Sequence, residues 1–309
     1  MKIARIVETT LRSPRRWCLG AIAVAAATGA CNGGSAVLTQ RLEAARLASA
    51  LHLDFTRANE AANRAVLSDM DDASIVAADE SKKAIASAGQ YLQQLRPVVS
   101  SLGYADEFKI LETFSQRFAE FETLEREILP LAVENTNLKA QRLSFGAGQD
   151  AADAFSKAVR ATVGHGPGPQ DTAAVVERSI AALLQVQVLQ ARHIAEPEET
   201  AMSQMEAQMR ELEGIARKGL ARLHELRPSA SVGHPAGGAG LGEPLDEADA
   251  ALDRFMSLNR EILELSRRNA NVRSLAMTLG RARVVSAACE DQLRALEASL
   301  QTHAFQATR

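Results

Sequence analysis

An internal repeat limits the folds open to this chain more than any other feature of its sequence. The triplet EIL at 127–129 recurs at 261–263. The other identical pairs at the same spacing are Phe121 and Phe255, Leu131 and Leu265, Asn135 and Asn269, Asn137 and Asn271, and Gly146 and Gly280. An LRP triplet at 95–97 returns at 226–228, at a slightly shorter spacing, and the difference falls in a longer connector of the second copy. The repetition predicts two related units, residues 35–163 and 171–307, which GHGPGPQ at 164–170 separates.

Both units have the composition and spacing of long helices. Aromatic residues make up only 4% of the chain, good helix formers are frequent, and few β-branched or aromatic runs alternate with period two. The breaks predict helices over 36–67, 72–100, 106–145 and 147–163, and then over 172–195, 198–226, 245–279 and 281–303. We therefore predict an all-α protein made of two tandem up-and-down four-helix-bundle-like modules with long helices.

The third helix of the first unit has an apolar stripe with the spacing of three and four residues that is typical of a bundle seam. The stripe contains Leu111, Phe114, Phe118, Phe121, Leu124, Ile128, Leu131, Leu138 and Phe145. Pro130 is expected to kink or split this helix. The same count places Asn135 and Arg142 on the stripe, and Asn269 on its counterpart. Asn137 and Asn271 lie about 200° away and are expected to face elsewhere.

The asparagines on the stripe have two interpretations. A buried Asn in a helical bundle fixes register and partner choice, provided that its amide finds hydrogen-bond partners. Alternatively, Asn135, Arg142 and Asn269 are ligand-binding residues of polar sites between helices, because a buried Arg requires an anion or a carboxylate. Ala276 replaces Arg142 in the second unit, so a site built on Arg142 would belong to the first unit alone.

The N-terminal residues 1–30 have the layout of a secretory signal peptide. Five basic residues precede the apolar run WCLGAIAVAAATGA, which is too short to cross a hydrocarbon core of about 30 Å. Cleavage before Cys31 resembles the processing of a bacterial lipoprotein, with Gly29 and Ala30 in place and Thr28 departing from the usual aliphatic residue. We expect a lipid-anchored periplasmic protein with Cys31 as the lipidation site. A plainly secreted protein and an uncleaved anchor that leads into the first helix are the alternatives.

Charge and cysteine content narrow the possible partners. The whole chain has a net charge of −3, and residues 1–30 carry five basic residues and one acidic residue, so the mature chain would be near −7. An acidic chain argues against nucleic acid as a partner. The cysteines are Cys18, Cys31 and Cys289. If Cys31 is lipidated, Cys289 is alone, and we expect it to be a small packed residue on a helix.

Known catalytic and metal-binding motifs are missing from the sequence. No acidic residue stands three positions before any histidine, so the Glu-x-x-His signature of a di-iron bundle is absent. No haem, zinc-protease, nucleophile-elbow or P-loop motif occurs either. His193 and Glu196, one helical turn apart, are expected to form a surface pair. We predict no enzyme, no cofactor and no metal site.

Two segments resemble the periplasmic four-helix-bundle sensor domain of methyl-accepting chemotaxis receptors and related histidine kinases. They are FTRANEAANRAVLSDMDDAS at 55–74 and FAEFETLEREILPLAVENTNLKAQRLSFGAGQDAADAF at 118–155. The resemblance covers about 120 residues of the first unit, and the second unit shares it weakly. It implies an exported sensory or ligand-binding bundle. Such receptors continue into a second membrane span and a signalling domain, which this sequence does not contain.

These observations lead to two functional expectations. The first is a lipid-anchored, chemoreceptor-like sensory bundle that docks to a membrane receptor or kinase, as a monomer or a homodimer. The second is a structural envelope lipoprotein whose long helices serve as a spacer or scaffold.

Overall fold

The computed structural model describes residues 27–163, 169–226 and 242–306, and helices account for almost all of them, with no strand among them. This confirms the all-α prediction. The elements are α1 (Ala27–Leu67), α2 (Asp71–Ser101), α3 (Ala105–Glu134), α4 (Thr136–Leu143), the π-helical turn η1 (Ser144–Gly148), α5 (Gln149–Ala161), α6 (Pro169–Ala195), α7 (Glu199–Glu225), α8 (Gly242–Arg268), α9 (Ala270–Met277), the π-helical turn η2 (Thr278–Ala282) and α10 (Arg283–Gln306).

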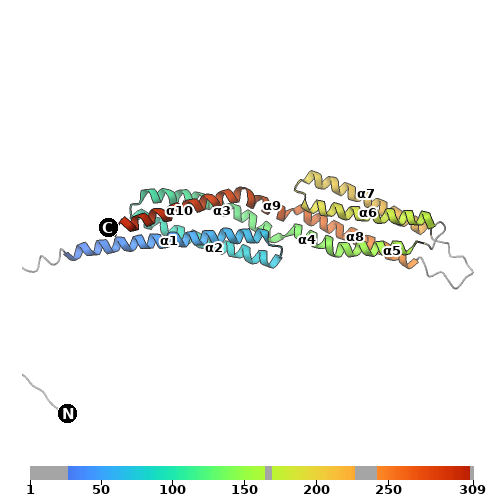
Figure 1. Cartoon of the computed structure of the whole chain (residues 1–309), viewed down its shortest axis with the longest axis horizontal. Coiled ribbons are helices and arrows are strands. Elements are labelled where there is room, and N and C mark those ends of the chain that lie inside the picture. Colours follow the sequence, from blue (N-terminus) through green and yellow to red (C-terminus); the bar gives the residue numbers. More distant parts are fainter. Residues whose placement is uncertain (1–26, 164–168, 227–241, 307–309) are drawn as a thin grey trace, which may run out of the picture.

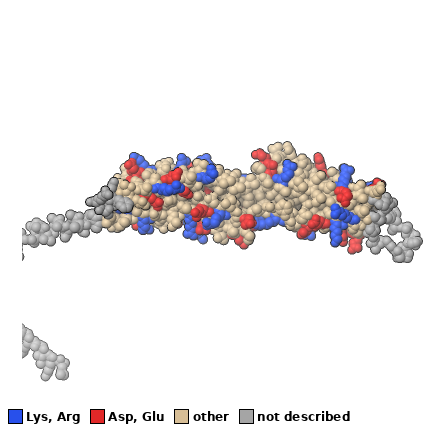
Figure 2. Space-filling model, in the orientation of Figure 1, with Lys and Arg blue, Asp and Glu red and all other residues tan. Residues whose placement is uncertain are grey.

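The helices form a rod with two bundles placed end to end (Figure 1). The first bundle contains α1, α2, α3, α9 and α10, and the second contains α4, α5, α6, α7 and α8. Helix α1 begins, and α10 ends, at the same end of the rod (Figure 1). On the face that Figure 2 shows, basic and acidic side chains are interspersed over both bundles.

The two bundles exchange their last helices. Helix α3 continues through Asn135 into α4 and α5, which pack on α8 and α6, while α8 continues through Asn269 into α9 and α10, which pack on α3 and α1. The sequence had predicted that each repeat would close its own bundle. Helix α3 has 30 residues and α2 has 31, so α3 reaches the end of its own bundle at Asn135. The chain does not reverse there, and α4 and α5 therefore lie beyond the first bundle, against α8 and α6 (Figure 1).

The cores of the two bundles differ in composition. In the first bundle, Phe55 of α1 packs against three phenylalanines of α3, with ring centroids 5.1 to 6.3 Å apart. Helix α10 contributes Cys289, which is fully buried, and burial raises the pKa of its thiol to about 12. The expectation that Cys289 is a packed residue is confirmed. The second core is mainly aliphatic, with methionines of α7, Phe255 of α8 and Phe155 of the exchanged helix α5.

The long helices are interrupted at equivalent positions of the two repeats, but not by the proline that the sequence analysis had singled out. Pro130 lies inside α3, and the helix ends only at Asn135. Gly146 and Gly280 fall within η1 and η2, two π-helical turns that begin at equivalent positions of the two repeats. Both repeats therefore have the same irregularity close to the junction. Turns of this kind are frequent at functional sites.

Part of the N-terminal prediction lies outside the described residues. Residues 1–26 and the side chain of Cys31 are not described, so the signal peptide and the lipidation of Cys31 stay predictions. In the part of the chain that the structure describes, one helical stretch, Gln170–Ala195 of α6, is long and apolar enough to cross a membrane. A core helix of a soluble bundle meets the same criterion, and the buried side chains of α6 include Val176, Leu183 and Val186.

Candidate functional site at the junction of the two bundles

The junction is built on two asparagines that stop one helix and start the next. Asn135 and Asn269 have φ values of 49° and 53°, and they are the only non-glycine residues with positive φ in the described chain. Asparagine tolerates this left-handed conformation better than most residues. Each residue ends a helix, and its carbonyl then accepts the first bond of the next, from the N–H of Lys139 or Arg273 at 2.9 Å.

The four asparagines of the two Asn-x-Asn pairs hydrogen-bond one another in a reciprocal pattern, and we call this set the clasp. Asn137 donates from Nδ2 to Oδ1 of Asn269 at 2.9 Å, and Asn271 donates in the same way to Asn135 at 2.8 Å. The backbone N–H of Asn137 donates to Oδ1 of Asn271 at 3.1 Å, and the reverse bond is 3.2 Å long. The first turn of α4 and the first turn of α9 are thus each capped by a side chain of the other repeat.

The remaining amide hydrogens of the clasp go to the helical hairpins. Asn137 donates to the carbonyl of Ile194 at 2.6 Å, and Asn269 donates to the carbonyl of Glu196 at 2.8 Å. Asn135 donates to the carboxylate of Asp71 at 3.1 Å. Every clasp amide therefore uses both its donor and its acceptor inside the protein. This removes the cost of burying these groups and ties both hairpins to the crossing helices.

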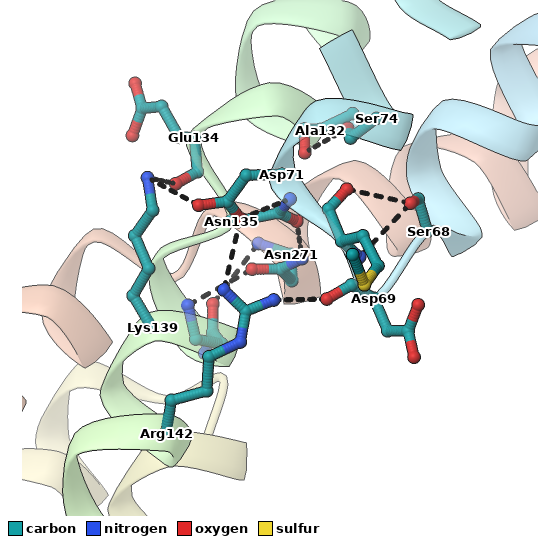
Figure 3. A network of polar contacts seen from close by, with 12 residues as sticks. Ser68, Asp69, Asp71, Ser74, Ala132, Glu134, Asn135, Lys139, Arg142 and Asn271 are labelled. Atoms are coloured by element: carbon teal, nitrogen blue, oxygen red, sulfur yellow. Dashed lines mark hydrogen bonds and ion pairs between the residues drawn. The ribbon is translucent and has the colours of Figure 1, made fainter. Parts of the chain in front are cut away.

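Asp71, in the first turn of α2, is the centre of a charged patch beside the clasp (Figure 3). Besides Asn135, it attracts Nη1 of Arg142 at 3.5 Å and Nζ of Lys139 at 3.7 Å. Arg142 also donates to the carbonyl of Asp69. Lys139 donates, at 2.8 Å, to the carbonyl of Glu134, the last residue of α3. The patch joins the α1–α2 turn to α4, so it reinforces the junction on one side.

The structure brings Asn135, Arg142 and Asn269 into one network, and it corrects two expectations about them. Asn135 and Asn269 are buried, as the apolar stripe predicted. Arg142 does not enter the core, because its side chain is 51% exposed and pairs with Asp71. Asn137 and Asn271 do not face away from the other two, because the left-handed residue breaks the helix and resets its phase. A count at about 100° per residue cannot cross such a break.

Sequence reasoning missed a second polar cluster, which lies in the core of the second bundle. Ser144 of η1 donates to Gln190 of α6 at 2.9 Å, and Gln190 donates to Asn259 of α8 at 2.8 Å. Gln190 and Asn259 lie on apolar stripes of their helices, which is the signal that could have revealed them.

His193, one turn after Gln190 on α6, has partners of its own and does not form the predicted surface pair with Glu196. The imidazole is fully buried, and its Nδ1 lies 2.6 Å from Oγ of Ser266 while its Nε2 lies 3.1 Å from Oε1 of Glu206. Burial lowers the pKa of His193. The guanidinium of Arg267, 2.6 Å from Glu206, lowers the pKa of that carboxylate. The predicted pairing with Glu196 was wrong because the actual partner, Glu206, lies on the neighbouring helix α7, which the spacing within one helix cannot show.

The side chains at the junction link the two bundles to each other. Its amides satisfy one another, and it contains no nucleophile activated by a neighbouring base. Among the described residues there is no group of three or more His, Cys, Asp or Glu side chains that could hold a metal ion. No family model, curated protein or solved structure matches the chain.

Proposed function

We propose that this protein is an exported sensory helical bundle, similar to the sensor domains of chemotaxis receptors, in which the clasp couples the two bundles. The observation that carries the proposal is the exchange of helices, because α3–α5 and α8–α10 each run through both bundles. A shift of α3 or α10 in the first bundle would displace α5 or α8 in the second. Packed helices with two discrete arrangements are the usual physical means of such coupling.

The proposed location is the periplasmic side of a membrane, with an N-terminal lipid on Cys31. The supporting geometry is the start of α1 at the free end of the first bundle (Figure 1). The second bundle would then point away from the membrane, where it could meet a receptor, a kinase or a second copy of the chain. Radiolabelled palmitate incorporation that is lost in Cys31→Ser tests the anchor, and unchanged incorporation would contradict it.

The sensory function is tested by ligand screening followed by hydrogen exchange. A metabolite that binds the native chain stabilises it by about 2.7 kcal/mol at a hundredfold excess over its dissociation constant, which a thermal-shift screen detects. With a hit in hand, hydrogen exchange is measured in both bundles. A ligand of the first bundle should change protection in α4 and α5 as well. Changes confined to the ligand's own bundle would contradict coupling through the clasp.

A second candidate function is a passive spacer in the cell envelope. The complete satisfaction of the clasp amides favours it, since a joint of this kind resists bending. The same experiment separates the two functions. A screen without hits, together with a stable envelope partner captured by cross-linking, supports the spacer.

A further inference from the structure

Glu125 of α3 is a buried acid whose position in the fold calls for a partner. Its side chain is 3% exposed, and its Oε2 atom is buried without a hydrogen-bond partner. The equivalent residue of the second repeat is Asn259. That amide is also buried, yet it accepts a hydrogen bond from Gln190. The same site of the fold is therefore internally satisfied in one bundle and open in the other.

Glu125 lines a cavity of about 530 Å³ between α2 and α3. The other walls are Lys82 and Ile85 of α2, and Glu122, Arg126, Leu129 and Pro130 of α3. Pro130 has no backbone N–H, so it cannot donate to the carbonyl oxygen of Arg126, four residues earlier. The lining thus combines two acidic residues, Glu122 and Glu125, with the apolar residues Ile85 and Leu129.

The two cations beside the cavity are occupied elsewhere. Lys82 pairs with Asp79 at 3.3 Å, and the guanidinium of Arg126 donates to the hydroxyl of Thr123 at 3.1 Å and to the carbonyl of Glu122 at 3.2 Å. No hydrogen bond or ion pair joins either cation to Glu125 in the described structure. Burial raises the pKa of Glu122, and it raises the pKa of Glu125 to about 7. An uncompensated buried carboxylate costs free energy that a bound cation would recover.

We propose that this cavity binds a small organic ammonium ion, whose charged group donates to Glu125 and whose apolar body packs against Ile85 and Leu129. The proposal deepens the sensory function and rests on it for its biological meaning. A metal ion fits the cavity less well, because apolar side chains form much of its wall and because hard cations require several oxygen ligands. The second bundle has Met256 and Asn259 at the positions of Glu122 and Glu125, so it should bind no amine.

The test is calorimetric titration of the full chain with n-butylammonium, with 1-butanol as the neutral probe of similar shape. We expect saturable binding of the amine and none of the alcohol. Glu125→Gln should weaken amine binding at least about tenfold, which corresponds to roughly 1.4 kcal/mol. Glu127→Gln, an exposed control on the same helix, should leave the affinity unchanged. Thermal melting of both variants establishes that they are folded.

Two further measurements keep the proposal falsifiable. Amine affinity of the native chain should fall as the pH drops below about 7, where Glu125 becomes protonated, and Lys82→Met should bind the amine at least as tightly as the native chain. Failure of the native chain to bind butylammonium at about 10 mM, a level that detects weak binding, or equal binding by Glu125→Gln, would overturn the site. Amine binding without any change of exchange in α4 and α5 would instead contradict the sensory function and leave the site standing.

Discussion

The two bundles have the same helical framework and differ in what fills it next to the clasp. Buried positions of α1 recur in α6 at a constant spacing, which pairs Phe55 with Leu183 and Ala62 with Gln190. The second bundle has a satisfied polar core there, in which Gln190 links Ser144 to Asn259. The first bundle has alanine in place of Gln190 and keeps Glu125 without a partner at its Oε2 atom. A duplicated framework thus has one bundle that satisfies its own polar groups and one that does not.

This difference shows how the repeats divide their roles. The clasp is nearly symmetric, so the geometry of the joint is the same in both repeats. Away from the clasp, the polar side chains of the second core fix the packing of α6 against α8, because buried hydrogen-bond networks specify a unique arrangement. In the first bundle, by contrast, Glu125 borders a cavity and its Oε2 atom has no hydrogen-bond partner.

The largest effect is expected from truncating an equivalent core residue in each bundle. Phe121→Ala and Phe255→Ala each remove a fully buried ring and should lower the free energy of unfolding by about 3–5 kcal/mol. Phe121 should cost more, because its ring packs on that of Phe55, with centroids 5.1 Å apart, where the second bundle has Leu183. Chemical denaturation measures both values. A larger loss for Phe255→Ala would contradict the comparison of the cores.

Removing one arm of the clasp should cost somewhat less. Asn137→Ala leaves the backbone N–H of Asn271, the carbonyl of Ile194 and Oδ1 of Asn269 without this partner. At roughly 1–3 kcal/mol for each buried group, and with water reaching some of them, we expect a loss of about 3 kcal/mol. Asn269→Gly is the matched variant for the backbone, since glycine keeps the left-handed conformation while the amide is lost. If the free energy of unfolding of Asn137→Ala equalled that of the native chain, the clasp would be dispensable for stability.

Acid should move the stabilities of the two bundles in opposite directions. The folded pKa of Glu125 is about 7, above its unfolded value of 4.5, so its contribution to stability grows as the pH falls from 7 to 4.5, by up to about 3 kcal/mol. His193 has a lowered folded pKa, so its contribution is complete above its unfolded value of 6.5 and is lost as the pH falls below it. Hydrogen exchange at pH 7 and pH 5 should show α3 gaining protection while α6 loses it. If protection in α3 and α6 changed in the same direction, the opposite pH dependence of the two bundles would be contradicted.

The smallest effect is expected at the exposed patch beside the clasp. Arg142→Ala removes a half-exposed partner of Asp71, and the equivalent residue of the second repeat is already Ala276. Exposed ion pairs contribute about 0.2–1 kcal/mol, so the melting temperature should change little, and less at high salt. A loss comparable to that of Asn137→Ala would mean that the patch is part of the clasp itself.

Sequence periodicity identified the helices and the buried face of α3 up to Asn135, because both depend on local spacing. The prediction that Phe145 lies on the same buried stripe was wrong, since its side chain is 62% exposed and the count had crossed the helix break at Asn135. The stripe through Phe114, Phe121 and Ile128 is the core face of α3, and Asn135 is buried where the stripe places it. Periodicity could not show which helices α5 packs on, because that depends on whether the chain reverses or continues at Asn135. It also missed the tertiary partners of His193 and the unpartnered Glu125, since both are defined by neighbouring helices.

The exchange of helices is tested most directly by thiol cross-linking between the repeats. With Cys18, Cys31 and Cys289 replaced by serine, cysteines are placed at 120 of α3 and 281 of η2, whose native side chains Glu120 and Arg281 lie 2.6 Å apart. The comparison pair is 120 and 153 of α5, which the continuous path through Asn135 separates by about 50 Å at roughly 1.5 Å per residue. We predict rapid intramolecular cross-linking of 120 with 281 and none of 120 with 153. Cross-linking of 120 with 153 and not with 281 would show that each repeat closes on itself.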